Sequence, residues 1–314
     1  MKTVQIRFIN GALTAVCGGL LIAALTSTSP ASATSTSTTA MRASRLSHCH
    51  PAAVAGSGGL LGGLKTVCQV ASTVPTNGDV NPYGLAVVPA TVGGLVAGDV
   101  LVSNFNNSHN LQGTGATIME ISPSGTASLF ANLAEQTKGP VGLTTALSVF
   151  ADGYVVVGSL PTTDGNARTA KAGALYVLNS HGRLVETIRG ANINGPWDMA
   201  SYDGGGFASL LLTNVLNDTV AGRGSIVRGG DVVRLVLDLT TSPPTVLQRT
   251  VIASGFKEKT DPNALVIGPT AWLSDRTGPS MSLTPSPIEL LQSTTGCSVT
   301  RVPESEGPCP PASS

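Results

Sequence analysis

Charged and aromatic side chains are scarce in this chain. Only 11% of its 314 residues are Asp, Glu, Lys or Arg, and 4% are Phe, Trp or Tyr. Long helices held by surface ion pairs need more charge, so an all-helical fold is excluded. The 18 bases balance the 18 acids, which leaves no electrostatic attraction for nucleic acid. The sequence also lacks the Gly-x-Ser-x-Gly, Walker and His-Glu-x-x-His motifs.

Glycine and proline are abundant instead, with 37 and 20 residues. Together with many Ser and Thr residues, they favour short strands joined by tight turns. The length fits one large domain or two small ones.

The first 33 residues have the features of an export signal. Lys2 and Arg7 precede a mostly apolar stretch at 12–25, and the Ala-Ser-Ala sequence at 31–33 suits a signal peptidase cut. The apolar stretch is too short and interrupted for a membrane anchor, which needs about 20 residues. Cleavage removes both bases and leaves 16 bases against 18 acids. We predict an extracytoplasmic product, periplasmic or secreted, without a stable membrane span.

Four cysteines follow the signal, and paired thiols persist in an oxidising compartment. We predict a disulfide between Cys49 and Cys68. The His-Cys-His sequence at 48–50 is an alternative metal site, although no second ligand set follows at zinc-like spacing. The other two cysteines are Cys297 and Cys309.

Residues 34–67 are rich in Ser, Thr, Ala and Gly and predict a tether. An internal repeat of about 56 residues begins after them. Each repeat holds a proline turn with an apolar strand, a hydrophobic strand that ends in small or amide residues, a strand that begins at glycine, and a fourth strand. The turns lie at 81–85, 139–143, 195–199 and 268–270, the second strands at 101–106, 155–160 and 211–216, the third at 115–121, 173–178 and 230–235, and the fourth at 127–130 and 184–188.

Four antiparallel strands per repeat are typical of a β-propeller blade. One blade cannot cover both its faces, so it is stable only when neighbours stack on it. We therefore predict an all-β fold, a β-propeller of four-stranded antiparallel blades over residues 68–270, with three blades and the start of a fourth. A β-sandwich with similar strand spacing is the alternative.

The repeat breaks at Thr270. Residues 271–314 contain 7 Pro and 9 Ser and predict an irregular tail. We can choose codons that encode residues 271–291 and that also encode a different peptide when one G is added in front of them. In this second reading frame the same bases encode Gly-Leu-Ala-Leu-Gly-Pro-Asp-Gly-Thr-Leu-Tyr-Val-Ala-Asp-Thr-Val-Ser-Asn-Arg-Ile-Ala. Because this reading restores the turn and both strands of the missing blade, we hypothesise a shifted reading frame that truncates the propeller.

The turns at 81–84 (Asn-Pro-Tyr-Gly) and 195–198 (Gly-Pro-Trp-Asp), with the segments 103–107 and 213–217, resemble exported bacterial NHL-type propellers over residues 68–270. The resemblance implies six blades in the intact family member, related in shape to gluconolactonase-like and strictosidine-synthase-like propellers. We expect a binding or scaffold module with an unknown protein or small-molecule ligand. The alternative is a Ca²⁺-dependent lactonase-like hydrolase that uses the channel mouth.

Amide and carboxylate side chains end the second strands or flank the first turns. Ca²⁺ takes about 6 to 8 oxygen ligands, so such residues from several blades would suit it. Gluconolactonase-like enzymes place an Asn of an Asn-Gly turn among their metal ligands, and Asn194 precedes Gly195 similarly. The same side chains also cap turns, so Ca²⁺ is a candidate cofactor only. The candidate ligand- or metal-binding residues are Asn81, Asn104, Asn194, Asp198, Asn214 and Asn217.

Other polar and aromatic residues are weaker candidates. Glu120 and Glu186 alternate with apolar neighbours, which predicts solvated strand faces. We expect His109 and His181 in exposed loops, and Trp197 as a wedge between blades.

Overall fold

The computed structural model describes residues 68–190, 192–270, 272–274 and 281–283. All the strands lie in the compact unit that runs from Val70 onward. The predicted signal, the predicted tether, Cys49, Cys297 and Cys309 lie outside the described residues. No helix within the described ranges has the length and apolarity needed to cross a lipid bilayer.

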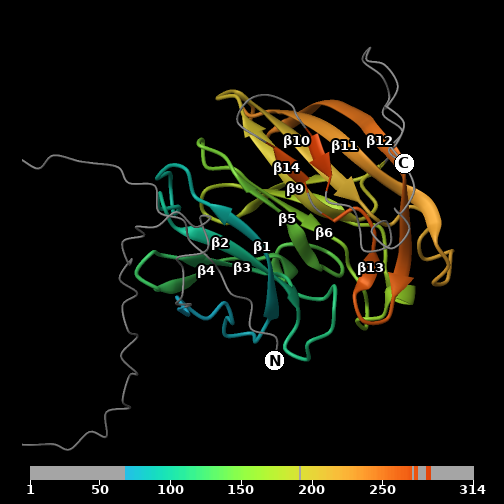
Figure 1. Ribbon diagram of the computed structural model, residues 1–314. Coiled ribbons are helices and arrows are strands. Elements are labelled where there is room, and N and C mark those ends of the chain that lie inside the picture. Colours follow the sequence, from blue (N-terminus) through green and yellow to red (C-terminus); the bar gives the residue numbers. More distant parts are fainter. Residues whose placement is uncertain (1–67, 191, 271, 275–280, 284–314) are drawn as a thin grey trace, which may run out of the picture. The chain divides into compact units, whose positions relative to one another are not determined.

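The described chain folds into antiparallel sheets whose strands follow one another in chain order. This arrangement confirms the predicted all-β fold of propeller blades (Figure 1). Blade 1 contains β1 (Val80–Val87), β2 (Val100–Asn106), β3 (Thr117–Ile121) and β4 (Ala127–Asn132), and blade 2 contains β5 (Leu143–Val149), β6 (Val155–Ser159), β7 (Ala174–Leu178) and β8 (Leu184–Ile188). Two short 3-10 helices, η1 (Leu133–Glu135) and η2 (Ala167–Thr169), lie in the loops of these two blades.

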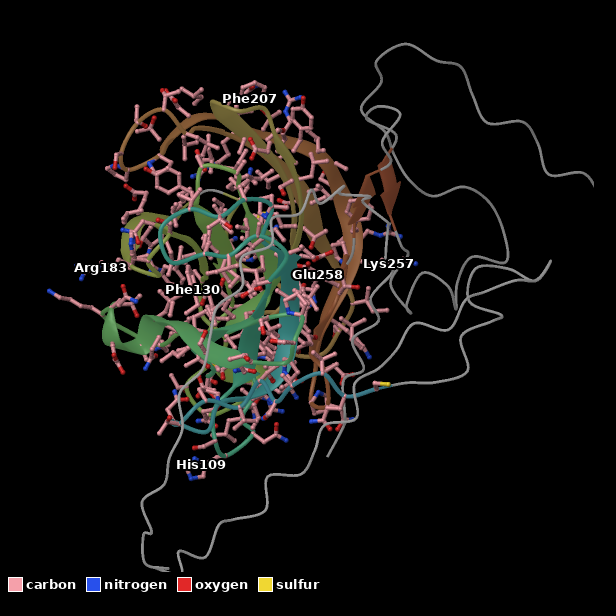
Figure 2. The ribbon with its side chains drawn as sticks, turned by 90° about the vertical axis from the view of Figure 1, so that its left-hand side faces the viewer. His109, Phe130, Arg183, Phe207, Lys257 and Glu258 are labelled. Atoms are coloured by element: carbon pink, nitrogen blue, oxygen red, sulfur yellow. The ribbon has the colours of Figure 1, made fainter. Side chains whose placement is uncertain are left out.

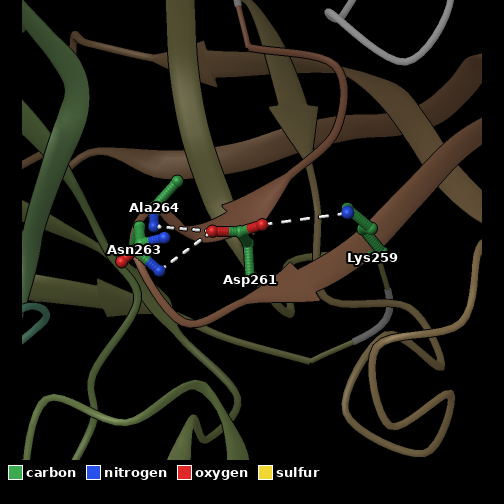
Figure 3. Close-up of polar contacts among 4 residues, drawn as sticks. All are labelled: Lys259, Asp261, Asn263 and Ala264. Atoms are coloured by element: carbon green, nitrogen blue, oxygen red, sulfur yellow. Dashed lines mark hydrogen bonds and ion pairs between the residues drawn. The ribbon is translucent and has the colours of Figure 1, made fainter.

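Blade 3 has a fifth strand. Its strand β12 has 17 residues and pairs with β11 and, through its last residues, with β13. The turn between β12 and β13 is fixed by Asp261, which accepts hydrogen bonds from the backbone N–H groups of Asn263 and Ala264 and pairs with Lys259 at 3.8 Å (Figure 3). The strands of blade 3 are β9 (Pro196–Asp203), β10 (Phe207–Asn214), β11 (Val227–Asp238), β12 (Thr245–Asp261) and β13 (Leu265–Ile267).

Two hydrophobic cores join the blades, one between blades 1 and 2 and one between blades 2 and 3. Strand β6 contributes to both, because successive side chains of a strand point to opposite faces. Val155 and Val157 lie in the first core, and Val156 lies in the second. A blade therefore has two apolar faces, and each face needs a neighbour.

Buried hydroxyl groups connect the first strands of the three blades. Ser103 Oγ accepts a hydrogen bond from the N–H of Gly84 and donates to the carbonyl of Thr144 in β5, both at 2.9 Å. Thr144 Oγ1 then donates to the carbonyl of Pro196 in β9 at 2.7 Å. These contacts fix the position of each blade relative to the next.

Glycine is required for steric reasons at the start of the third strand of a repeat. A Cβ atom on Gly115 would overlap the carbonyl oxygen of Asn104, and one on Gly173 would overlap that of Ser159. The backbone of the second strand thus passes too close for any side chain.

A short hairpin follows blade 3, formed by β14 (Trp272–Ser274) and β15 (Met281–Leu283). Strand β14 lies beside β9, as β9 lies beside β5 and β5 beside β1. The residues after Thr270 thus begin with a strand in the place of a fourth blade's first strand, where the sequence predicts an irregular tail.

Candidate functional site

Three of the predicted site residues meet in one hydrogen-bond network at the end of blade 3 where β9 begins and β10 ends. Asn214 is fully buried, and its Oδ1 accepts from the N–H groups of Asn194 at 2.9 Å and Gly195 at 2.5 Å. Asn194 Nδ2 donates to Asn217 Oδ1 at 2.5 Å. Both amide oxygens are therefore occupied by donors of the protein itself, and they cap the turn that precedes β9.

Asp231 belongs to the same network, although sequence reasoning does not find it. It lies opposite Asn214 in the β10–β11 ladder, and its Oδ2 accepts from Asn217 Nδ2 at 3.1 Å. The residue is only 6% exposed, and its Oδ1 has no hydrogen-bond partner in the described part of the chain. Burial raises the pKa of Asp231 to about 6, against the opposing effect of hydrogen bonds from Asn214 and Asn217.

Glu258 is a second buried carboxyl group, on β12. It is 0% exposed, its Oε1 accepts from Thr219 Oγ1 at 2.5 Å, and its Oε2 has no partner among the described residues. Burial raises its pKa to about 8, and the charge of Asp231 adds to the rise. Gly230 leaves the necessary space, since a Cβ there would lie 3.1 Å from Glu258 Oε2. Figure 2 shows Glu258 within the protein and Lys257 directed away from it.

The two carboxyl groups differ in protonation between about pH 6 and pH 8. In that interval Asp231 is ionised and Glu258 is protonated, which is the pairing that a general base and a general acid require. The described residues contain no group of three or more His, Cys, Asp or Glu side chains that could hold a metal ion. A cation would therefore need amide, backbone or water oxygens in addition to these two carboxylates.

Asn104 and Asn81 belong to a separate group in blade 1. Asn104 is fully buried, and its Nδ2 donates to the carbonyl of Thr73 at 2.8 Å and to Thr117 Oγ1 at 3.2 Å. Its Oδ1 has no partner in the described structure. Asn81 has a positive φ of 64° and donates through Nδ2 to Asn106 Oδ1 at 3.2 Å. These hydrogen bonds of Asn81 and Asn104 reach residues of blade 1 and Thr73 before it, and none of them reaches a residue of blade 3.

The remaining predicted site residue, Asp198, is fixed through its main chain. Its N–H donates to Thr213 Oγ1 at 3.0 Å, and its carbonyl accepts from the same hydroxyl at 3.4 Å. These contacts hold β9 against β10 next to the network.

The sequence held one signal for Asp231 and none for Glu258. Asp231 follows the glycine of the third repeat, where the other two repeats have Ala116 and Ala174, so it is a charge in an otherwise apolar position. Glu258 lies between Lys257 and Lys259, a pattern typical of a solvated strand. Burial of that segment depends on the tertiary structure.

The prediction for Glu120 is wrong. This side chain is buried, its Oε1 accepts from the N–H of Val96 at 3.1 Å, and burial raises its pKa. A loop crosses the strand face that was expected to meet solvent. Glu186 is half-buried. His109 and His181 lie exposed in loops, as predicted. Figure 2 shows His109 at the margin of the protein.

Trp197 forms the predicted wedge. Its ring lies edge-on to Tyr83 and Phe105 of blade 1, with ring centroids 5.6 Å apart in both pairs, and Tyr83 stacks on Phe105 at 5.0 Å. Cys68 takes part in a disulfide, and its predicted partner Cys49 lies outside the described residues.

The blades and their stacking define this chain as a partial β-propeller. The sequence matches no known family, and no curated protein matches it. A variant of the Synechocystis apocarotenoid oxygenase is similar in structure, with 10% identity and a TM-score of 0.39 over 70% of this chain and 53% of the oxygenase. An α-L-arabinanase of Penicillium chrysogenum has 11% identity and a TM-score of 0.35 over 70% of this chain and 68% of its own. The chain thus spans about half the length of the oxygenase, and both similarities are too distant to indicate an activity.

Proposed function

We propose that this chain is an exported β-propeller of the NHL type that acts as a binding or scaffold module for a protein or small-molecule ligand. The observation that carries the proposal is the state of the amide side chains. Asn214 Oδ1 and Asn217 Oδ1 accept hydrogen bonds from neighbouring protein donors. Side chains that cap their own turns rigidify loops and leave few oxygens for a metal, which suits a scaffold better than a calcium enzyme.

Calcium chloride and glucono-1,5-lactone are the probes that test this proposal. A scaffold should keep the same unfolding temperature when calcium is added, and should not accelerate hydrolysis of the lactone above the buffer rate. A rise in unfolding temperature together with calcium-dependent lactone hydrolysis would contradict it, because a ligand that binds the native state stabilises that state.

The hydrolase remains a second candidate because Asp231 and Glu258 each present an oxygen that has no hydrogen-bond partner among the described residues. In this candidate Asp231 activates water and Glu258 protonates the leaving group. Lactone hydrolysis should then show a bell-shaped pH profile between about 6 and 8. The variants D231N and E258Q should each lose it, while D238N, which alters a half-buried carboxyl group at the end of β11, should retain it. Loss of activity in all three variants would point to misfolding and not to a catalytic pair.

Export is tested separately from ligand binding. The chain, expressed in a bacterium with its first 33 residues, should appear outside the cytoplasm with Thr34 as its first residue. Replacement of Ala31 and Ala33 by arginine should block cleavage. An uncleaved cytoplasmic product from the unchanged chain would refute export.

A further inference from the structure

The end of strand β12 extends past the sheet of blade 3. The ladder between β11 and β12 ends at the pair Val227 and Glu258, and residues 259–261 pair with β13 instead. We name residues 257–267 the strap. It consists of the end of β12, the turn that Asp261 fixes (Figure 3), and β13. The strap is thus a hairpin whose far end leaves its own blade.

The far end of the strap packs on a cluster that all three blades share. Leu265 and Val266 are 1% and 3% exposed. They belong to one hydrophobic cluster with Phe105 of blade 1, Leu160 at the end of β6 in blade 2, and Trp197 of blade 3. The strap therefore contributes to the cluster that contains the aromatic wedge between blades 1 and 3.

A hydrogen bond links the turn of the strap to blade 1. Gln112, in the loop between β2 and β3, donates through Nε2 to the carbonyl of Asn263 at 3.0 Å, and this bond is exposed to solvent. Water can replace an exposed hydrogen bond at little net cost. The strap is thus tied to blade 1 by a contact that can break without unfolding either partner.

Glycines flank the strap on both sides. Gly255 has a φ of 85°, and a Cβ atom there would meet nothing within 4 Å among the described residues. Gly268 follows the strap directly. The ladder beside Gly255 shifts register twice between Val227 and Asp231, and Leu265 has a positive φ of 62°, which is a strained conformation for leucine. Flexible positions at both ends of a segment are typical of a hinge.

Glu258 is the buried titratable group of the strap. Its side chain is 0% exposed, its Oε1 accepts from Thr219 Oγ1, and its Oε2 has no partner among the described residues. Burial raises the pKa of Glu258 to about 8, and the charges of Asp231 on β11 and Asp218 in the loop before β11 add to the rise. A movement of the strap would carry this carboxyl group into water.

No ion pair offsets a negative charge on Glu258 in the described part of the chain. Arg168 of η2 and Arg228 of β11 belong to elements that pack against β12, and neither forms an ion pair with Glu258. On its own strand, Lys259 pairs with Asp261, and Figure 2 shows Lys257 directed away from it. An ionised Glu258 is therefore more stable in water than in its buried site.

We propose that the strap is a cover that opens as a unit between Gly255 and Gly268 when Glu258 loses its proton. Opening carries the carboxylate into water and uncovers the hydrophobic cluster around Trp197. Because the open strap gives up this proton at a lower pH than the closed strap, the ratio of open to closed strap should rise about tenfold per pH unit up to the folded pKa of about 8 and level off above it.

Hydrogen exchange of the full-length protein between pH 6 and pH 9, followed by peptide mass spectrometry, tests this device. Protection factors, corrected for the intrinsic exchange rate at each pH, compare the amides of residues 259–267 with those of β6. In the unchanged chain we expect the strap to be at least about tenfold less protected than β6 at every pH. Its protection should fall about tenfold per pH unit from pH 6 to pH 8. Equal protection of strap and β6 would overturn the proposal, since the strap would then open together with the whole protein.

Three variants separate the parts of the proposal. E258Q keeps the size of the side chain without its charge, so the protection of the strap should be the same at pH 6 and pH 8. Q112A removes the hydrogen bond to Asn263 and should lower that protection about twofold to tenfold, with β6 unchanged. Q136A is the matched control, because Gln136 Nε2 donates to the carbonyl of Gly182 at 3.0 Å and not to the strap.

Two results with these variants would contradict the opening of the strap. One is a strap whose protection still falls with pH in E258Q, and the other is a strap that Q112A and Q136A affect equally. Q112A and the unchanged chain decide the outcome even where E258Q does not fold.

Discussion

Asn214 and Asp231 lie directly opposite each other on β10 and β11, and Asn217 joins them by donating to Asp231 Oδ2. An amide that caps a turn is thereby linked to a buried carboxyl group whose pKa is raised to about 6. This link places a titratable group within the framework that positions β9.

The stability of the protein should fall as the pH rises from 4 to 8. The pKa of Asp231 is raised from 3.8 to about 6 and that of Glu258 from 4.5 to about 8, so the unfolded chain loses these protons first. The two protonated carboxyl groups stabilise the folded state fully below about pH 4. This contribution is lost as the pH rises past the folded pKa of each group. At 1.36 kcal/mol per unit, the loss is about 3 kcal/mol for Asp231 and about 5 kcal/mol for Glu258.

Urea unfolding between pH 4 and pH 9 measures this dependence. D231N should flatten the curve between pH 4 and 6, and E258Q should flatten it up to pH 8. D238N is the control, because hydrogen bonds to Thr240 lower the pKa of Asp238 and confine its effect to lower pH. A stability that stays level across this range in the unchanged protein would contradict the buried carboxyl pair.

Loss of the Thr219 hydroxyl should destabilise the protein. This hydroxyl donates to Glu258 Oε1 in a buried site, so T219V leaves both oxygens of the carboxyl group without a side-chain donor in the part of the chain that the structure describes. The expected cost is about 1 to 3 kcal/mol, measured by urea unfolding at pH 7. T219S keeps the hydroxyl and should lose less, and an equal loss in the two variants would show that the methyl group matters more than the hydrogen bond.

Gly173 should not tolerate alanine. A Cβ atom there would overlap the carbonyl oxygen of Ser159 on the neighbouring strand, so G173A should lose several kcal/mol or fail to fold. Gly206 is the matched control, because among the described residues a Cβ there meets just the Thr240 side chain, at an ordinary 3.4 Å. Thermal unfolding of both variants decides the matter, and an unchanged midpoint for G173A would refute the close approach of the two strands.

Trp197 should contribute strongly to the stability of the three-blade unit. It is buried against Tyr83 and Phe105, and truncation of such a residue costs about 3 to 5 kcal/mol. W197A should therefore lower the unfolding midpoint, measured by circular dichroism. Y202A removes an aromatic ring from an exposed position and should change stability by about 0.5 kcal/mol or less. Similar losses in both variants would mean that Trp197 is not a wedge between blades.

The local pattern of the sequence predicts most of the blade strands. Strands β2 and β6 follow from apolar runs that end in small or amide residues, and β7 follows from an apolar run that comes after a glycine. Such runs are expected where both faces of a strand are buried. The long strand β12 does not follow, since its exposed residues at 245–248 and its charges at 257–259 have no apolar alternation. It forms because β11 offers it a continuous edge to pair with.

The sequence by itself determined the repeat, the turns and the asparagines that cap them, because these depend on backbone geometry within a few residues. Only the tertiary structure decided which polar groups lose water. Asp231, Glu258 and Glu120 are ordinary charged residues in the sequence, and their burial results from strands and loops that lie far away along the chain. Desolvation is a property of all the neighbours in space, so no local pattern reveals it.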